Sequence, residues 1–182
     1  MTGVQTCALP ICRLLRLADQ FVQGLRAEEA PLIIEPVELA ALLDEAADQC
    51  WEAAQRVGGR VTVTASWDIP DLSTDRAFMA RAVVNLIDNA LKYGGEAPQV
   101  DVRGWFRAGR AVITVADRGP GLSPDRRAAL FAPFERAGAT RPDGAGLGLA
   151  LVSTFARRQD GAVRCISREG VGTVFELSIP VL

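Results

Sequence analysis

The alternation of strand and helix patterns after Pro31 is the feature that most restricts how this chain can fold. Val61, Val63 and Ala65 alternate with polar residues, which is the two-residue period of a half-buried strand. Apolar residues up to about Tyr93 instead follow the period of an amphipathic helix. These segments do not repeat as regular βαβ units, so the sequence predicts an α/β fold, a two-layer α/β sandwich with a mixed sheet.

The same patterns give approximate boundaries for each element. Helices are expected at about 37–57, from a cap at Ser73, Thr74 or Asp75 to 93, and at 147–158. Strands are expected at 32–35, 60–67, 100–107, 110–116, 162–167 and 173–180, with a hairpin turn at Ala108-Gly109. The Gly/Pro/Arg-rich segment 118–144 is expected to be a loop with a short helical stretch inside it.

The first thirty residues are expected to lie outside this domain. Residues 2–11 resemble the translation of a common sequencing-library adapter, and they lack the basic start of a signal peptide. We therefore expect residues 1–12 to be non-native and the parent protein to extend further upstream. In residues 13–30, an apolar stripe including Leu14, Leu17 and Phe21 predicts a helical stub followed by a linker. Residues 31–182 are then predicted to form one domain.

Composition excludes several classes of function. The formal net charge is -2 over 182 residues, which offers no basic surface for nucleic acid. No apolar run approaches the roughly 20 residues needed to span a membrane. The four cysteines show no metal-binding spacing and are expected to be thiols in a reducing cytosol. The chain contains no histidine, so it lacks the commonest general base and cannot phosphorylate itself on histidine.

Scarce residue types gather in the segment Asn85 to Tyr93, which reads NLIDNALKY. It contains both asparagines, the only lysine and the only tyrosine of the chain. On a helix, Asn85, Asn89 and Lys92 share one face. The opposite, apolar row is expected to face the sheet and comprises Met79, Val83, Leu86 and Ala90. Amide oxygens suit Mg²⁺ and a lysine suits phosphate. The alternative is a solvated polar face, but such faces in this chain otherwise consist of Arg, Asp and Glu.

Two glycine-containing segments offer further ligand-binding chemistry. Asp117 follows a strand and precedes Gly119 and Gly121, so a carboxylate there can accept a hydrogen bond from an exocyclic amine. The glycines within 144–148 precede or open a helix, whose N-terminal amides can bind an anion. Neither segment has the spacing of a Walker loop or of a dinucleotide fingerprint. Taken separately, each is a weak signal.

Taken together and in order, four motifs resemble those of the ATP-binding domain of sensor histidine kinases. That domain belongs to the GHKL superfamily, which also contains Hsp90, DNA gyrase and MutL. The motifs are NLIDNALKYG at 85–94, DRGPG at 117–121, LFAPFERA at 130–137 and GAGLGLAL at 144–151. The resemblance covers about residues 31–182. It implies the Bergerat ATP-binding fold, with ATP and Mg²⁺ as ligands.

The resemblance also implies a role for each matching residue. Asn89, with Asn85, would position Mg²⁺, Lys92 would contact phosphate, and Tyr93 and Asp117 would recognise adenine. Gly119 and Gly121 would shape the pocket, and a lid carrying arginines would be anchored by two phenylalanines. The complete ATP-binding set is Asn85, Asn89, Lys92, Tyr93, Asp117, Gly119, Gly121, Phe131, Phe134, Arg136, Arg141, Gly144, Gly146, Leu147 and Gly148.

Within the superfamily, one position separates kinases from hydrolases. Hydrolytic members have a glutamate four residues before the magnesium asparagine, where this chain has Asn85. An amide cannot act as a general base, so hydrolysis of ATP is expected to be poor. In the family, the γ-phosphoryl passes to a histidine on a homodimeric helical hairpin and then to a response-regulator receiver domain. The acceptor histidine is absent from this chain, so no catalytic residue is assigned and no autophosphorylation is expected.

The function predicted is therefore that of the catalytic, ATP-binding domain of a protein-histidine kinase in a two-component system. It is expected to be a cytoplasmic domain, and the sequence leaves open whether the parent protein is anchored in the inner membrane. Two alternatives remain. One is a serine-protein kinase of the anti-sigma-factor type on the same fold, which needs no dimerisation hairpin. The other is a nucleotide-sensing module with no transfer activity.

Overall fold

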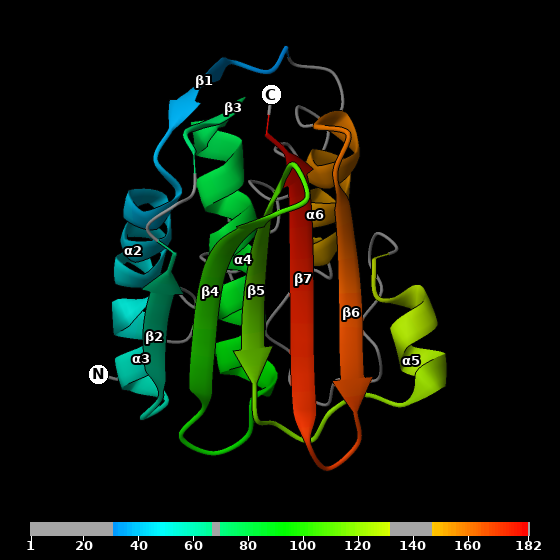
Figure 1. The fold of residues 1–182 in the computed structure, drawn as a ribbon. Coiled ribbons are helices and arrows are strands. Elements are labelled where there is room, and N and C mark those ends of the chain that lie inside the picture. The colour runs from blue at the N-terminus through cyan, green and yellow to red at the C-terminus, as the bar shows by residue number, and fades with distance from the viewer. Residues whose placement is uncertain (1–30, 67–69, 132–146, 182) are drawn as a thin grey trace, which may run out of the picture.

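A five-stranded sheet in the order β2-β4-β5-β7-β6 organises the chain (Figure 1). The computed structural model describes residues 31–66, 70–131 and 147–181. The helices are α2 (Leu39–Gln49), α3 (Trp51–Arg56), α4 (Arg76–Tyr93), α5 (Pro124–Ala129) and α6 (Gly148–Arg158). The strands are β1 (Ile34–Val37), β2 (Arg60–Ala65), β3 (Leu72–Asp75), β4 (Gln99–Arg107), β5 (Arg110–Asp117), β6 (Ala162–Arg168) and β7 (Gly172–Pro180).

The fold has two layers, as the sequence predicts. Helices α2, α4 and α6 lie side by side on one face of the sheet, and α5 lies beside the edge formed by β6 (Figure 1). Strand β2 runs parallel to β4, whereas the other pairs in this sheet are antiparallel. The predicted mixed sheet is thereby confirmed. None of the described helices is both long enough and apolar enough to cross a membrane.

Helix α4 is the central element of the helical layer. Asp75 caps it, because its Oδ1 accepts a hydrogen bond from the backbone amide of Phe78 at 2.9 Å. The predicted apolar row of Met79, Val83, Leu86 and Ala90 is buried, with at most 1% of each side chain exposed. This face packs on β4 and β5 and against α2 and α6. The opposite polar row is therefore held in a fixed direction by the core.

Three details differ from the sequence-based boundaries. The predicted helix at 37–57 is divided into α2 and α3 at Cys50, whose amide donates to the carbonyl of Ala47 in a tighter turn. No glycine or proline marks that break in the sequence. The first strand lies at Ile34–Val37 and pairs antiparallel with β3, a strand that the sequence did not predict. Asp117 is the last residue of β5 and not the first residue after it.

Other predictions fall where expected or beyond the described residues. Ala108 and Gly109 both have a positive φ and connect β4 to β5 as a tight hairpin turn. Cys50 and Cys165 are free thiols. The predicted helix within 13–27, the adapter-like residues 1–12 and most of the predicted loop after 131 lie outside the described residues, so those assignments remain predictions.

Candidate functional site

A buried carboxylate at the end of the central strand β5 is the first component of the site. Asp117 is 8% exposed, and its Oδ1 accepts hydrogen bonds from the amides of Gly119 at 2.8 Å and Thr173 at 3.3 Å. Oδ2 accepts no hydrogen bond from any described residue. One oxygen is thus held by the fold, and the other remains an acceptor for a ligand.

Burial makes the ionised form of the Asp117 carboxyl unfavourable. Burial raises the pKa of its carboxyl above the ordinary value, and the two hydrogen bonds from Gly119 and Thr173 oppose that rise only in part. No described cation lies within ion-pair distance of this carboxylate. A ligand that donates a hydrogen bond to Oδ2 would offset part of this cost.

Thr173 is a site residue that the sequence reasoning missed. It is buried at the start of β7, where it is the register partner of Asp117. Its amide bonds to Asp117, and its hydroxyl lies 2.9 Å from the hydroxyl of Ser167. The Ser167 hydroxyl also accepts from the amide of Leu122 at 2.9 Å and lies 3.0 Å from the carbonyl of Gly172. The pairing of β7 with β5 and with β6 identifies Thr173 and Ser167, and no local sequence pattern shows it.

Replacing Ser167 by alanine tests whether this network positions the loop that follows Asp117. The change removes the acceptor of the half-buried Leu122 amide, and losing such a hydrogen bond costs about 1 kcal/mol. We expect lower thermal stability and ATP binding weakened by roughly threefold to tenfold, measured by calorimetry. Ser167→Thr keeps the hydroxyl and should retain most of the affinity. Ser178→Ala, which removes a hydroxyl from β7, is the control. Unchanged stability and affinity in Ser167→Ala would contradict this role.

The loop after Asp117 fits tightly between α4 and β6. A Cβ at Gly119 would lie 2.5 Å from the carbonyl oxygen of Tyr93. Gly121 has φ +69°, and a Cβ there would overlap the carbonyl group of Arg168. The amide of Gly170 also donates to the carbonyl of Pro120 at 2.8 Å. Gly119 therefore allows the loop to lie against the C-terminal end of α4, and Gly121 allows it to lie against the end of β6.

The polar row of α4 forms the second component. The Nδ2 of Asn85 is buried and has no hydrogen-bond partner among the described residues. Asn89 is half-buried, and its side chain makes no hydrogen bond to a described residue. Lys92 forms an ion pair with Asp88 one turn earlier, and both are about one-third exposed. Tyr93 is 44% exposed beside the Asp117 loop. The amides are consequently free of intramolecular partners among these residues.

The start of α6 meets this row. A Cβ at Gly148 would lie 3.3 Å from the Oδ1 of Asn85, so Gly148 allows the two helices to approach closely. Leu147 is buried just before α6, and no side chain caps the first amides of this helix. Free amides at a helix N-terminus favour an anion. The segments around Gly148 and Asp117, which are distant in the sequence, therefore both lie against α4, near Asn85 and near Tyr93 respectively.

The predicted lid lies largely outside the described residues. Phe131 packs against Phe175 of β7, with ring centroids 6.3 Å apart in an edge-to-face arrangement. Phe131 thus contacts the body of the domain, as expected of an anchor. The remaining lid and glycine residues predicted for the site, Phe134, Arg136, Arg141, Gly144 and Gly146, are not among the described residues.

The residues present suit Mg²⁺ held mainly by a nucleotide. Mg²⁺ prefers oxygen ligands and is commonly bound by one or two protein groups, with phosphates and waters completing its shell. The side chains of Asn85 and Asn89 offer amide oxygens that no described hydrogen bond occupies. Among the described residues no group of three or more His, Cys, Asp or Glu side chains could hold a metal ion without a nucleotide.

An α/β sandwich with a buried acceptor at a strand end, next to an asparagine row and a helix N-terminus, is the arrangement of a nucleotide-binding domain. The chain belongs to the histidine kinase-, DNA gyrase B-, and HSP90-like ATPase family, whose family model matches residues 74–182. Its homologues are sensor histidine kinases, and the described residues form the catalytic, ATP-binding domain of such a kinase. The fold and the domain family predicted from the sequence are confirmed.

Individual relatives agree with that assignment. The chain is 40% identical over 114 residues to the histidine protein kinase DivJ of Caulobacter vibrioides, covering 62% of this chain and 19% of DivJ. It is 31% identical over 173 residues to the sensor-like histidine kinase SenX3 of Mycolicibacterium smegmatis, covering 91% of this chain and 45% of SenX3. The chain therefore spans less than half the length of these curated relatives.

A solved structure gives the same result in three dimensions. Full-length ShkA in complex with AMPPNP superimposes with a TM-score of 0.83 at 32% identity, over 92% of this chain and 36% of ShkA. The mycobacterial sensor histidine kinase MprB gives a TM-score of 0.72 at 28% identity, over 81% of this chain and 98% of that structure. The described residues thus correspond to one domain of larger kinases.

Proposed function

We propose that this domain binds Mg·ATP between α4, the Asp117 loop and the start of α6, and that it delivers the γ-phosphoryl group to a histidine on a separate helical hairpin. The observation that supports this most is the state of Asp117. One of its oxygens is fixed by two backbone amides, and the other is free to accept from a ligand. An exocyclic amine such as that of adenine is the complementary donor.

Each part of the nucleotide would meet a different segment. The adenine amino group would donate to the Oδ2 of Asp117, with the exposed ring of Tyr93 beside the base. The phosphates would lie toward Asn89, Lys92 and the first amides of α6, where positive charge and free N–H groups favour anions. Lys92, which now pairs with Asp88, would then bind a phosphate oxygen, either in addition to Asp88 or in its place. In this orientation the base of the nucleotide is buried and its phosphates are exposed.

Asn85 and Asn89 would hold Mg²⁺ together with phosphate oxygens, and the ion would neutralise the negative charge of the phosphates. Neither amide can accept a proton from water. The described part of the site therefore has no general base on this face of α4 apart from Asp88, which is paired with Lys92. We infer that bound ATP is hydrolysed slowly and awaits a stronger nucleophile.

Within the parent protein that nucleophile would be a histidine of a homodimeric hairpin, and a response-regulator receiver domain would accept the phosphoryl group next. The chain has no histidine of its own. The names and functions of the relatives support this proposal, because DivJ and SenX3 are both histidine kinases. The chain alone is expected to bind ATP without labelling itself.

Calorimetry of Asn89→Ala with ATP in the presence and absence of Mg²⁺ tests the proposed site. Loss of one metal ligand should weaken Mg²⁺-dependent binding by roughly tenfold to a hundredfold, or about 1.4–2.7 kcal/mol. Binding without Mg²⁺ should change much less. Phosphate release measured in the same samples should be negligible for both proteins.

Gln55→Ala is the matched control, since it removes an exposed amide from α3 and leaves α4 unchanged. Equal affinity of the Asn89→Ala and wild-type proteins for Mg·ATP would exclude a metal role for Asn89. Rapid phosphate release by the wild-type chain would instead show a hydrolase. Binding without transfer to any histidine-bearing hairpin would favour a nucleotide-sensing module.

A further inference from the structure

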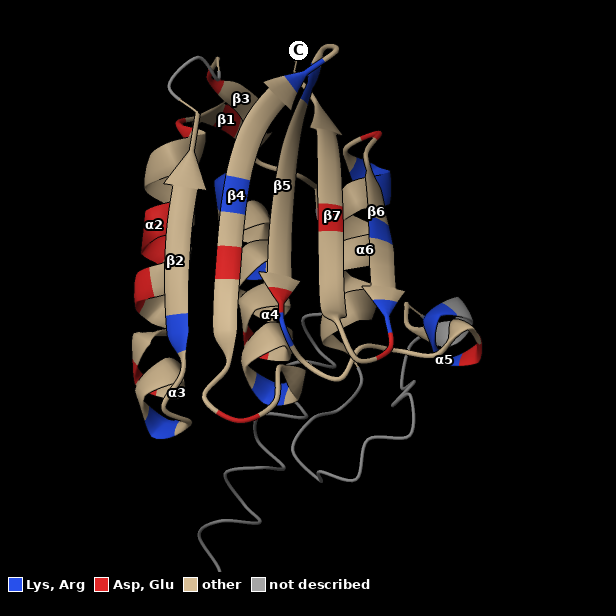
Figure 2. Ribbon diagram, turned by 60° about the horizontal axis from the view of Figure 1, so that its bottom comes forward, with Lys and Arg blue, Asp and Glu red and all other residues tan. Residues whose placement is uncertain are grey.

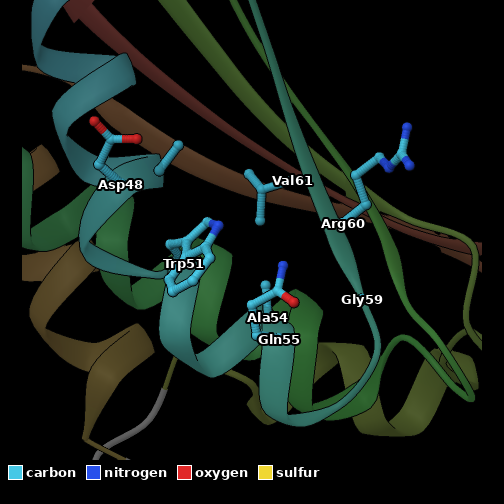
Figure 3. A pocket seen from close by; sticks show the side chains of 8 residues that line it. Asp48, Trp51, Ala54, Gln55, Gly59, Arg60 and Val61 are labelled. Atoms are coloured by element: carbon cyan, nitrogen blue, oxygen red, sulfur yellow. The ribbon is translucent and has the colours of Figure 1, made fainter.

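A groove separate from the nucleotide site lies between α3 and the outer edge of β2 (Figure 3). Its volume is about 290 Å³. Asp48, Trp51 and Gln55 line it from the helical side, and Arg60 and Val61 line it from the strand. Trp51 is 61% exposed, which is unusual for so large an apolar side chain. Neither the fold nor the proposed ATP site uses this indole.

The edge of β2 offers unpaired backbone groups along this groove. Within the described residues, β2 pairs only with β4. The amides of Arg60 and Ser66 donate to the carbonyls of Pro98 and Gly104 at 2.8 and 2.9 Å. Because backbone groups alternate in direction along a strand, those of Val61, Val63 and Ala65 point away from β4. These groups can pair with an added strand.

The two edges of the sheet differ in how they are protected. Charged residues commonly block strand addition at exposed edges. The opposite edge, β6, has Arg164 and Arg168 and lies beside α5 (Figures 1 and 2). Strand β2 has no charged residue or proline after Arg60, its first residue. Its free edge is thus the less protected of the two.

Acidic residues lie along the helix next to this edge. Asp44, Asp48 and Glu52 are spaced four residues apart and share one exposed side of α2 and α3. None of the three forms an ion pair with a described residue. Figure 2 shows acidic segments along α2, beside β2. Asp48 and Arg60 line the groove with opposite charges, and Asp44 and Glu52 add further negative charge to the helical side beside it.

We propose that this groove binds an extended, basic segment of a partner protein, which adds as a strand to the edge of β2. Backbone hydrogen bonds to Val61, Val63 and Ala65 would supply the main affinity. Side chains opposite Val61 and Val63 would project toward the helices, because directly paired residues share one face of a sheet. An arginine there would stack on Trp51 and lie near Asp48. The same segment would be repelled by the arginines of β6.

The test uses a capped synthetic peptide of about nine residues that alternates arginine and valine, a length typical of a strand. Isothermal calorimetry with the complete chain measures binding, and NMR identifies the site. We expect binding, with the amide signals of Val61, Val63 and Ala65 and the indole signal of Trp51 shifting most. A matched peptide with glutamate in place of arginine should bind at least roughly tenfold more weakly.

Two variants and one control localise the interaction. Trp51→Ala and Asp48→Lys should each weaken peptide binding by roughly tenfold. Ile166→Ala, which removes an exposed apolar side chain from β6, should leave it unchanged. All three should retain Mg·ATP binding, because none of these residues lies in the nucleotide site. This retention separates the docking proposal from the proposed kinase function.

Several outcomes would overturn the proposal. They are no measurable binding of the arginine peptide, equal binding of the glutamate peptide, or the same affinity after Trp51→Ala and Asp48→Lys. Shifts confined to β6 would place the peptide on the wrong edge. If sedimentation shows instead that the chain dimerises through β2, and Trp51→Ala dissolves the dimer while no peptide binds, the occupant is a second copy.

Discussion

Replacing Asp117 by asparagine should abolish tight ATP binding and leave the domain folded. The side-chain oxygen of asparagine can still accept from the amides of Gly119 and Thr173, as Oδ1 does now. Its NH₂ group would then occupy the position of Oδ2 and face the adenine amino group, donor against donor. Both donors are then unsatisfied, at about 1–3 kcal/mol each, so we expect the affinity to fall by roughly thirtyfold or more. Calorimetry with Mg·ATP measures this directly.

The same variant should show a change in stability that depends on pH. Burial raises the pKa of Asp117 in the folded protein. Below its unfolded pKa, near 4, both states are protonated and the charge costs nothing. As pH rises from that value through the raised folded pKa, the unfolded state ionises first, and stability is lost. The amide that replaces the carboxyl cannot ionise, so Asp117→Asn should gain stability relative to wild type as the pH rises toward neutrality.

Denaturant unfolding at several pH values checks this expectation. Asp44→Asn is the control, because it removes the same charge from an exposed site on α2. It should leave ATP affinity unchanged. If Asp117→Asn binds ATP as tightly as wild type, the base does not donate to this carboxylate. If it is much less stable at neutral pH, the ionised carboxylate stabilises the fold more than its burial costs.

A second large effect is expected from Gly121→Ala. Gly121 and Gly170 have similar backbone conformations, with φ +69° and +74°. A methyl group at Gly170 would meet nothing within 4 Å, whereas one at Gly121 would overlap the carbonyl of Arg168. Gly170→Ala should therefore lower the free energy of unfolding only by the strain of a left-handed alanine, about 1 kcal/mol. Gly121→Ala adds a steric clash and should cost about 3 kcal/mol or more in total.

Urea unfolding of the two variants gives the comparison, since their difference isolates the contact from the backbone conformation. Gly121→Ala should also weaken ATP binding, because the loop from Asp117 to Leu122 must move away from β6. If the two alanine variants lose the same free energy of unfolding, the backbone at Arg168 moves easily to make room for the methyl group. The loop is then not held in a fixed position by β6.

The sequence predicts those helices and strands that are long enough to show a periodic pattern of apolar residues. Eighteen residues of α4 show both the buried row and the polar row, and β2 alternates exposed and half-buried residues as expected. Strand β3 has only four residues, which is too short to show a period. The break at Cys50 has no glycine or proline to mark it. Both features depend on packing between distant segments.

The candidate site was predictable to a similar degree. The segment from Asn85 to Tyr93 and the aspartate at the end of β5 were recognisable because each motif is local. Thr173 and Ser167 were not, because their roles depend on the register of β5 against β7 and β6 against β7. The close approach of Gly148 to Asn85 likewise joins residues far apart in the chain. Sequence motifs named the groups proposed to face the ligand, and tertiary pairing supplied those that hold them.

The pairing of Asp117 with Thr173 has a consequence for how this protein acquires its activity. The two residues are separated by 56 positions, and they meet only when β7 has joined the sheet beside β5. Closing such a long loop is slow compared with forming a helix or a local hairpin. The base pocket is thus expected to be complete only late in folding. Nucleotide added during refolding would bind the finished domain and draw the equilibrium toward it, without accelerating the earlier steps.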